Sequence, residues 1–570
     1  MTRPSIDVVL CWHMHQPEYR DPRDSVYQQP WTYLHAVKDY VDMAAHLERW
    51  PNARAVVNFV PILLEQLDDY ATRIADFAEH GKASRLHDPV LMALADPRSV
   101  PRNKRLFVLK ALTRANQQRM IARFPAFEQL VATANALLAQ NPAPEHIANA
   151  LIADLAVWYH LAWLGETVRQ ENPMVQALSE QDAGFAKHQR HALLGLIGEQ
   201  IASIFPRYAK LAAAGRIELS MTPYAHPIVP LLLDLHSGQE SRPQDPVPQA
   251  AAYPEPHERV MWHLQQGRAV FKQYFQQEPT GVWPSEGALS AETVALFAKA
   301  GVRWLASGQQ VLQRALDRSA LDCQCQHQVY QYQAHKTALF FRDDGLSDLI
   351  GFDYQNWHAD DAVADLQQHI HRIADICAEG EQQTSRPLVP IILDGENAWE
   401  YYPDNGFWLL EGLYKTLSQD PRINLTTFDE HLKHSKSRAR LEHLPAGSWV
   451  HGDLATWVGN PEKNRAWDYL VAARKAYRKA EASQRWDAET QQTCARQLAV
   501  CEGSDWFWWF GGENPAQAMR DFDQLFRLQL TRLYTLIKQS PPEYLQQPIC
   551  TISTSSDEAA EAGGVMRRGS

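Results

Sequence analysis

The stretch VVLCWHMHQPEYRDP, residues 8–22, decides the expected fold. Its apolar run stops abruptly at two histidines, His13 and His15, followed by a polar segment. Side chains two residues apart in a strand point to the same face, so both imidazoles are expected to project from one side of the strand's end. Such a pair suits a metal site, a sugar-binding site or a hydrogen-bonded polar rim.

Similar short apolar segments recur along the chain. Seven are predicted as buried strands: IDVVLCWHMH (6–15), ARAVVNFV (53–60), RIELSMT (216–222), TGVWPSE (280–286), VRWLASG (302–308), ALFFRDD (338–344) and LVPIILDGE (388–396). Near-continuous apolar runs are typical of parallel strands covered on both faces, although Pro390 removes a ladder donor from the last. Polar residues follow most of these runs. A parallel α/β barrel carries its active site there, at the carboxyl ends of its strands.

Helical periodicity divides the rest of the chain. A long helical stretch at about 61–214 is predicted as an insertion into a barrel domain spanning 1–435. Residues 436–550 are predicted to form a C-terminal helical bundle that completes the cleft. The small, polar residues 551–570 are predicted to be a disordered tail.

Composition limits the classes of partner. The 570 residues are 45% hydrophobic and 21% charged, and the formal net charge is -12 without any run of Lys and Arg. Nucleic-acid binding needs a concentrated basic patch, so no nucleic-acid partner is expected. No stretch of about 18 apolar residues is present, so no membrane partner is expected either. The 18 Trp and 20 Tyr, beyond building a core, are suited to stacking against sugar rings.

Cysteine usage and the N-terminal sequence bear on location. Among the seven cysteines only Cys323 and Cys325 are close in sequence, and Cys-x-Cys is a poor spacing for a disulfide or a zinc site. The first residues lack the pattern of a signal peptide. These features favour a reduced, cytoplasmic protein.

Two acidic segments carry the candidate chemistry. GVWPSEGALS places Glu286 after a strand and beside Trp283, while LDGENAWE places Asp394 and Glu396 on one face at a strand's end, followed by Trp399. A single acid in such a place is often a helix cap or a solvated rim. The helix after Glu286 has its own cap in Ser290, however, which leaves Glu286 without that explanation.

Carboxylates on different strand ends, each near an indole, are what glycoside cleavage requires. One acid protonates the leaving oxygen, and the other attacks the anomeric carbon or activates water. Further polar and aromatic side chains fit a sugar cleft or, equally, packing between domains. They include Tyr224, His226, Asp344, Trp457 and Asp468.

Five motifs in order now suggest a family. HMHQPEY, GRIELSMTPYAHP, GVWPSEGALS, LDGENAWE and TWVGNPEKNRAWDYL, spread over about residues 5–515, resemble the motif regions of glycoside hydrolase family 57. The WPSE and LDGEN wording resembles the amylopullulanase-like branch. The resemblance implies a (β/α)7 barrel followed by a helical bundle. It also implies retaining cleavage of α-glucosidic bonds in starch, glycogen or maltodextrin, with no metal or organic cofactor.

The resemblance also implies residue roles. Glu286 matches the nucleophile and Asp394 the general acid/base, with their carboxyl groups expected about 5–6 Å apart for retention. His13 and His15 match residues of the first motif that line the sugar site. The second motif contains Glu218, Tyr224 and His226, and the fifth contains Trp457 and Asp468.

Three alternatives stay open. An α-glucan transglycosylase, either a 4-α-glucanotransferase or a branching enzyme, would share the same covalent intermediate. A glucan-binding protein that has lost catalysis is another alternative, although the presence of both acids argues against it. A metal-dependent deacetylase or mannosidase-like hydrolase could use His13 and His15, but Gln16 beside them is a poor zinc ligand. The sequence does not separate α-1,4 from α-1,6 specificity or indicate an oligomeric state.

Overall fold

Seven parallel β-segments, called staves below, form a barrel at the centre of the molecule. The computed structural model describes residues 5–379, 386–396, 398–512 and 514–551. Six staves are strands: β1 Ile6–Met14, β2 Ala55–Phe59, β3 Ile217–Met221, β4 Trp304–Ser307, β6 Ala338–Phe341 and β7 Leu388–Asp394. The seventh is reduced to Val282, which forms parallel bridges to Met221 in β3 and Leu305 in β4. All seven staves fall within the predicted segments.

The staves close into a barrel. Strands β7, β1, β2 and β3 are neighbours in that order, and β4 pairs with β6, always in parallel. The Asp343 N–H, just beyond β6, donates to the Pro390 carbonyl in β7 at 2.8 Å. Pro390 has no N–H to offer, but its carbonyl takes part in this closure.

The barrel interior is apolar until the staves end. Val9 and Cys11 point into an inner cluster with Trp304 and Phe340, and Phe428 closes it from below. His13 is the next residue of β1 on the same face. The inward face of β1 therefore changes from packing to polar chemistry near the carboxyl end, where a parallel barrel has its active site.

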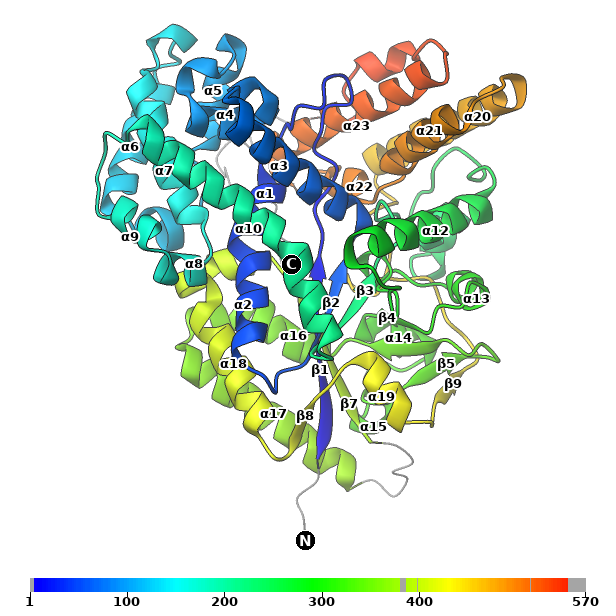
Figure 1. Ribbon diagram of the computed structural model, residues 1–570. Coiled ribbons are helices and arrows are strands. Elements are labelled where there is room, and N and C mark those ends of the chain that lie inside the picture. Colours follow the sequence, from blue (N-terminus) through cyan, green and yellow to red (C-terminus); the bar gives the residue numbers. More distant parts are fainter. Residues whose placement is uncertain (1–4, 380–385, 397, 513, 552–570) are drawn as a thin grey trace.

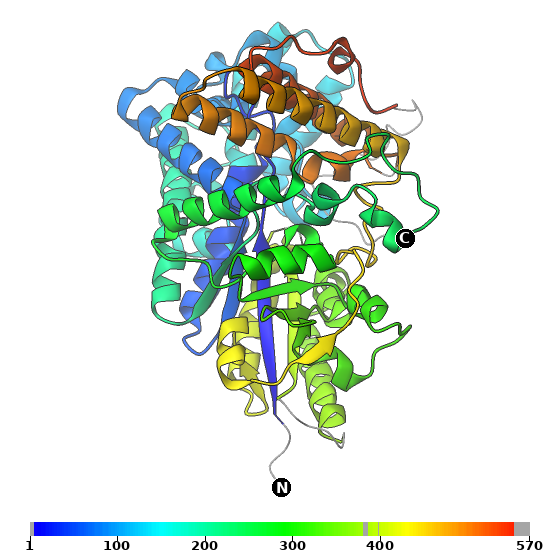
Figure 2. The same ribbon diagram turned by 90° about the vertical axis from the view of Figure 1, so that its right-hand side faces the viewer.

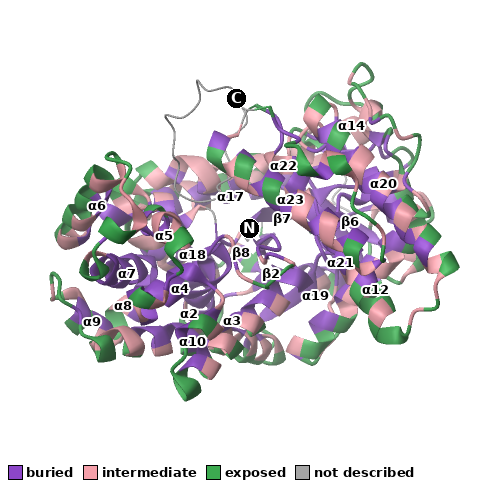
Figure 3. Ribbon diagram, turned by 90° about the horizontal axis from the view of Figure 1, so that it is seen from above, coloured by how far each residue is buried: buried purple, intermediate pink, exposed green. Residues whose placement is uncertain are grey.

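Helices cover the barrel on the outside (Figure 1). The insertion between β2 and β3 contains the helices α3 Pro61–His80, α4 Pro89–Ala95, α5 Arg105–Ala111, α6 Pro125–Leu138, α7 Asn149–Trp163, α8 Glu166–Glu171, α9 Pro173–Ser179 and α10 Lys187–Ala213. The remaining helices around the barrel are α1 Trp31–His35, α2 Val41–Arg49, α11 Val229–Leu233, α12 Pro256–Phe275, α13 Ala291–Lys299, α14 Gln309–Ala315, α15 Cys323–Gln326, α16 Asp344–Asp348, α17 Ala359–Ala378, α18 Phe407–Gln419 and α19 Phe428–His434. Seen from above, buried residues fill the centre and exposed ones the rim (Figure 3).

The C-terminal region begins differently from the predicted helical pattern. Short strands β5 Tyr330–Tyr332 and β9 Ala439–Leu441 pair with each other, while β8 Ile423–Leu425 pairs with the start of β1. An irregular segment, 442–460, then precedes the four helices α20 Pro461–Ser483, α21 Ala488–Cys501, α22 Asp505–Trp509 and α23 Ala516–Leu536. These helices lie beyond the carboxyl ends of the strands (Figure 2). The predicted tail lies outside the described residues except for Thr551.

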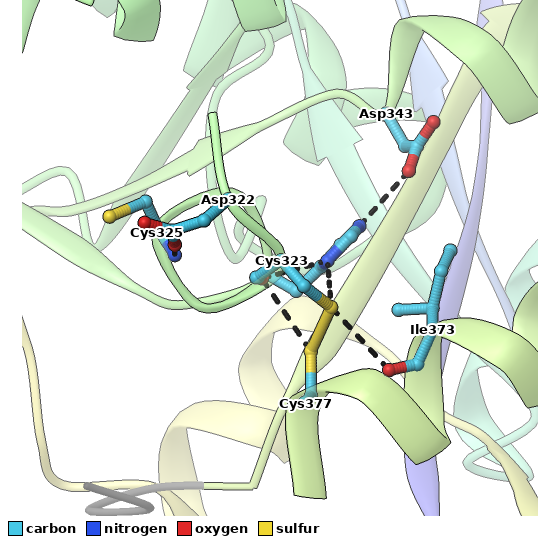
Figure 4. Close-up of a disulfide and its surroundings, with 7 residues drawn as sticks. Asp322, Cys323, Cys325, Asp343, Ile373 and Cys377 are labelled. Carbon is cyan, nitrogen blue, oxygen red and sulfur yellow. Dashed lines mark hydrogen bonds and ion pairs between the residues drawn. A yellow bond between two sulfur atoms is a disulfide. The ribbon is translucent and has the colours of Figure 1, made fainter. Parts of the chain in front are cut away.

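The prediction that all cysteines are reduced is wrong for one pair. Cys323 of α15 and Cys377 of α17 form a disulfide (Figure 4). The partners are 54 residues apart, so sequence spacing gives no sign of the bond. Among the described helices, none combines the length and apolar character needed to cross a membrane.

Candidate active site

Glu286 sits on a strained turn directly after the shortest stave. Its φ of 56° is left-handed, a conformation that costs a non-glycine residue roughly 1–2 kcal/mol. Gly287 follows with φ of 59°, and a Cβ there would meet the Trp283 ring at 2.9 Å. The WPSEG wording thus supplies a glycine where backbone shape and space both require one.

Trp449, from the segment 442–460, fixes the Glu286 carboxylate. Its indole Nε1–H donates to Glu286 Oε2 at 2.9 Å, and its backbone N–H donates to the Glu286 carbonyl at 3.1 Å. His226 Nε2 lies 4.0 Å from the other carboxylate oxygen, and the Glu286 side chain is 14% exposed. The acid is therefore held in place but still reaches solvent.

Asp394 ends β7 beside the first histidine motif. In the sheet register it is the Cα partner of His13, and the next N–H, that of Gly395, donates to the His13 carbonyl at 2.7 Å. Burial raises the pKa of Glu286 to about 8; the negative charge of Asp394 adds to the rise and the Trp449 hydrogen bond opposes it. The charge of Asp394 therefore acts on Glu286, and together with burial it favours the protonated form of Glu286 near neutral pH.

Glu396, two residues after Asp394, is buried and accepts hydrogen bonds from the first motif. Its Oε1 accepts from the His15 N–H at 3.1 Å and from Gln16 Nε2 at 3.3 Å. Burial, followed by the charge of Asp394, holds the pKa of Glu396 well above its ordinary value. Glu396 thus holds the His15 backbone and the Gln16 side chain in place.

Three imidazoles stack next to the acids. The ring centroids of His15 and His226 are 3.9 Å apart, and those of His13 and His226 are 5.3 Å apart. The predicted common face of His13 and His15 is confirmed, with centroids 5.9 Å apart. Trp283 lies beside them, 6.3 Å from His13 between ring centroids.

Each imidazole is oriented by one partner. His13 Nδ1 bonds Asn58 Oδ1 at 2.7 Å, His226 Nδ1 bonds the Ser504 hydroxyl at 2.8 Å, and His15 Nε2 bonds Asp505 Oδ1 at 2.8 Å. Ser504 and Asp505 come from the start of α22. The C-terminal helical region therefore contributes two residues to a site built on the barrel.

The protonation of His13 follows from this network. Burial lowers the pKa of His13 to about 3 and that of His226 well below its ordinary value, so both rings are neutral. Asn58 Nδ2 donates to Ser220, which leaves Asn58 Oδ1 as the acceptor facing His13 Nδ1–H. His13 Nε2 is then an acceptor, and it has no hydrogen-bond partner among the described residues.

The geometry of part of this cluster would allow it to bind a metal ion. His15, His226 and Asp505 each offer a ligand atom, all within 4.8 Å of one another. The sequence hypothesis of a metal site paired His13 with His15 and lacked a nearby carboxylate. Asp505, 490 residues from His15, supplies one.

Glu218, a predicted substrate-binding residue, is placed away from the carboxyl ends of the staves. It is the second residue of β3, at the amino end of the barrel, where its carboxylate accepts from Trp304 Nε1 at 2.6 Å, from the Asp429 N–H at 2.8 Å and from the Thr280 hydroxyl. Those donors satisfy a buried acid that joins the barrel floor to α19. It is therefore a structural residue.

Four further residues predicted to bind substrate contact other parts of the fold instead. The Tyr224 hydroxyl donates to Glu65 at 2.8 Å, and Asp468 accepts from the backbone N–H of Gln249 and Ala250. Trp457 is buried with its ring 5.7 Å from that of Trp508. Trp399 donates to the Gly395 carbonyl at 2.9 Å and packs against Trp12, behind the acids. None of these contacts involves Glu286 or the histidines.

Asp344 is connected to the site indirectly, through Arg342. It pairs with Arg342 at 3.0 Å, and the Arg342 guanidinium lies 5.5 Å from the centre of the Trp449 ring. Asp344 therefore supports the residue that holds Glu286.

Sequence reasoning missed four residues that shape the site. They are Asn58, Trp449, Ser504 and Asp505. Asn58 had a signal, since it is a polar residue inside the apolar strand VVNFV. Trp449 and the Ser504–Asp505 pair follow no local pattern, because they reach the site from distant segments.

Carboxyl groups at the carboxyl ends of a parallel barrel, beside imidazoles and indoles, are typical of a barrel glycosidase. The chain belongs to glycosyl hydrolase family 57, whose family model matches residues 9–444. No characterised protein in the curated sequences gives a significant match.

Solved structures share the fold at low sequence identity. A family 57 branching enzyme from Thermococcus kodakaraensis matches with a TM-score of 0.58 and 14% identity over 93% of this chain and 90% of its own. A branching enzyme of the same type from Pyrococcus horikoshii gives 0.57 and 15% over 98% of both chains. The α-amylase AmyC of Thermotoga maritima gives 0.54 and 11% over 94% and 93%.

Proposed function

We propose that the protein cleaves α-glucosidic bonds of starch, glycogen or maltodextrin with retention of configuration. Glu286 acts as the nucleophile and Asp394 as the general acid/base. The observation that carries this proposal is the placement of Glu286 and Asp394 at the carboxyl ends of their staves, on either side of the stacked rings of His13 and His226. Membership of family 57 supports the substrate class.

The reaction needs one proton shared by the pair. Asp394 gives a proton to the glycosidic oxygen as the C–O bond breaks, while the ionised Glu286 attacks the anomeric carbon and forms a glucosyl ester. Asp394, now ionised, takes a proton from water or from a sugar hydroxyl, which then displaces Glu286. In the free protein the pKa of about 8 favours the proton on Glu286. Catalysis by this route requires the proton to pass to Asp394 when substrate binds.

Neutral imidazoles suit the recognition of an uncharged sugar. His13 Nε2 is placed to accept from a hydroxyl of the glucose unit at the cleavage point. His226 Nε2 is buried and unpaired among the described residues, 4.0 Å from Glu286. Because the pKa values of His13 and His226 are lowered, both rings are neutral and add no positive charge beside Glu286.

The fate of the intermediate distinguishes hydrolase from transglycosylase. Similarity to two branching enzymes and an amylase supports either outcome. Chromatography of products from maltoheptaose, amylose and pullulan tests it. Shorter products alone favour hydrolysis, longer linear products favour glucanotransfer, and new α-1,6 linkages favour branching. Cleavage of pullulan would support the amylopullulanase-like branch. Binding of maltodextrin without any product would overturn the proposal in favour of a non-catalytic protein.

A metal-dependent hydrolase is the second candidate, because His15, His226 and Asp505 converge. Treatment with EDTA separates the two. The proposed mechanism uses no metal, so activity should survive chelation and dialysis; loss that Zn²⁺ restores would favour the second candidate.

We also propose a cytoplasmic location, which cell fractionation tests. The Cys323–Cys377 disulfide weighs against it, since such bonds are typical of oxidising compartments.

A further inference from the structure

A second cluster of ligand atoms lies away from the candidate active site. Cys323, His327 and Cys377 each offer a ligand atom, all within 4.8 Å of one another (Figure 4). Cys323 and His327 are four residues apart on α15 and its C-cap, so they share a face. Cys377 comes from the last turn of α17.

A buried carboxylate orients the histidine toward the sulfur atoms. His327 Nε2 lies 3.0 Å from Asp343 Oδ2, and both side chains are buried. Asp343 is itself fixed, because its other oxygen accepts from the Leu346 N–H at the start of α16. A carboxylate on one ring nitrogen is the usual partner of a metal-binding histidine.

This arrangement leaves the second ring nitrogen available. Nδ1 lies 3.4 Å from Cys323 Sγ, and in a metal-bound form, with the proton on Nε2 facing Asp343, it would supply the lone pair. In the disulfide form Nδ1–H donates to the Cys323 carbonyl at 3.0 Å, so a bound ion would replace this bond and release its proton. Two thiolates and one imidazole form a ligand set that suits Zn²⁺, with water as the fourth ligand.

We propose that the reduced protein binds one Zn²⁺ through Cys323, Cys377 and His327, and that the disulfide is the oxidised, metal-free form. A phosphine reductant supplies two electrons and becomes a phosphine oxide with the oxygen of one water, whose two protons convert the S–S bond into two thiols. Zn²⁺ binding then releases both thiol protons to solvent. Either the disulfide or the ion would join α15 to α17, beside the Asp343–Pro390 bond that closes the barrel.

Cobalt and zinc titrations of the full chain test this site. The protein is reduced with a phosphine under argon, stripped with EDTA, desalted and titrated with Co²⁺, whose charge-transfer absorption reports thiolate ligands. Zn²⁺ is then added with a competing chelator to measure the affinity. We expect one thiolate-ligated ion per chain, and Asp343→Asn should weaken binding about 10–100-fold. Absence of the thiolate band in the reduced wild-type protein would overturn the proposal.

Variants separate this site from the active-site cluster. Cys323→Ser/Cys377→Ser should lose the thiolate band, whereas the matched control Cys325→Ser should keep it, because Cys325 Sγ lies outside the cluster, 3.3 Å from Arg318. His226→Gln should also keep it. Should the double variant fail to fold, alkylation of the wild-type protein decides: Zn²⁺ should protect Cys323 and Cys377 but leave Cys325 reactive. Equal reactivity of the three thiols with and without Zn²⁺ would contradict the proposal.

Discussion

Trp449 donates twice to Glu286, from its indole to the carboxylate at 2.9 Å and from its backbone to the carbonyl at 3.1 Å. The two residues are 163 positions apart in the sequence. The indole bond lowers the pKa of Glu286, while burial and the charge of Asp394 raise it. Trp449 therefore both positions the acid and adjusts its protonation.

The pH dependence of activity should report the shared proton. The pair loses it as the pH rises through about 8, so kcat/KM on maltoheptaose should fall above that pH. Trp449→Phe removes a bond that lowers the pKa, so the alkaline limb should move to higher pH. Trp486→Phe, a half-buried indole packed on Tyr477, is the control and should leave the limb in place. An unmoved limb in Trp449→Phe would contradict this role.

Glu286→Gln should abolish turnover and become more stabilising as the pH rises. The folded protein raises the pKa of Glu286 from 4.5 to about 8, so the stability associated with its protonated form is complete below about 4.5 and is lost as the pH rises through 8. Glutamine cannot ionise and avoids that loss, worth at most about 5 kcal/mol. Thermal unfolding of both proteins at pH 5 and pH 8.5 measures it. If the Tm of Glu286→Gln differs from that of the wild-type protein by the same amount at both pH values, the pKa of Glu286 is not raised.

Gly287→Ala should lower kcat at least about tenfold, since a side chain there must displace the Trp283 ring or the Glu286 turn. Gly301→Ala is the matched control: it also has positive φ, but nothing lies within 4 Å of its added Cβ. Both variants should lose about 1 kcal/mol of stability from backbone strain. Steady-state kinetics that show the same kcat for the two variants would refute the steric argument.

A buried ion pair should hold the Ser504–Asp505 turn in the site. Glu502 accepts from Arg259 at 2.7 Å and from His263 at 2.8 Å, and all three side chains are buried. Glu502→Gln leaves Arg259 without its charge partner and should cost about 3–5 kcal/mol of unfolding free energy, measured by urea denaturation. Exposed Glu489→Gln on α21 should cost less than about 0.5 kcal/mol. A loss in Glu502→Gln no larger than in this control would contradict the anchoring role.

Local pattern predicted the barrel and the two acids, because the staves are apolar runs and some of them end directly before a polar residue of the site. His13, Glu286 and Asp394 were accessible in this way. The position of a residue along its strand could not be predicted in this way. Glu218 lies near the start of β3, and only the register shows that it faces the floor of the barrel. Trp449, Ser504, Asp505 and the partner of Cys323 depend on chain segments meeting in space, which no local spacing encodes.

The most direct test of the central claim is covalent trapping of the nucleophile. The wild-type enzyme is incubated with 5-fluoro-α-glucosyl fluoride, whose fluoride leaves readily while the ring fluorine slows turnover, and its peptides are then analysed by mass spectrometry. The account predicts a fluoroglucosyl ester on Glu286 and none in Glu286→Gln. A label on another acid, or turnover of the reagent without any ester, would contradict it.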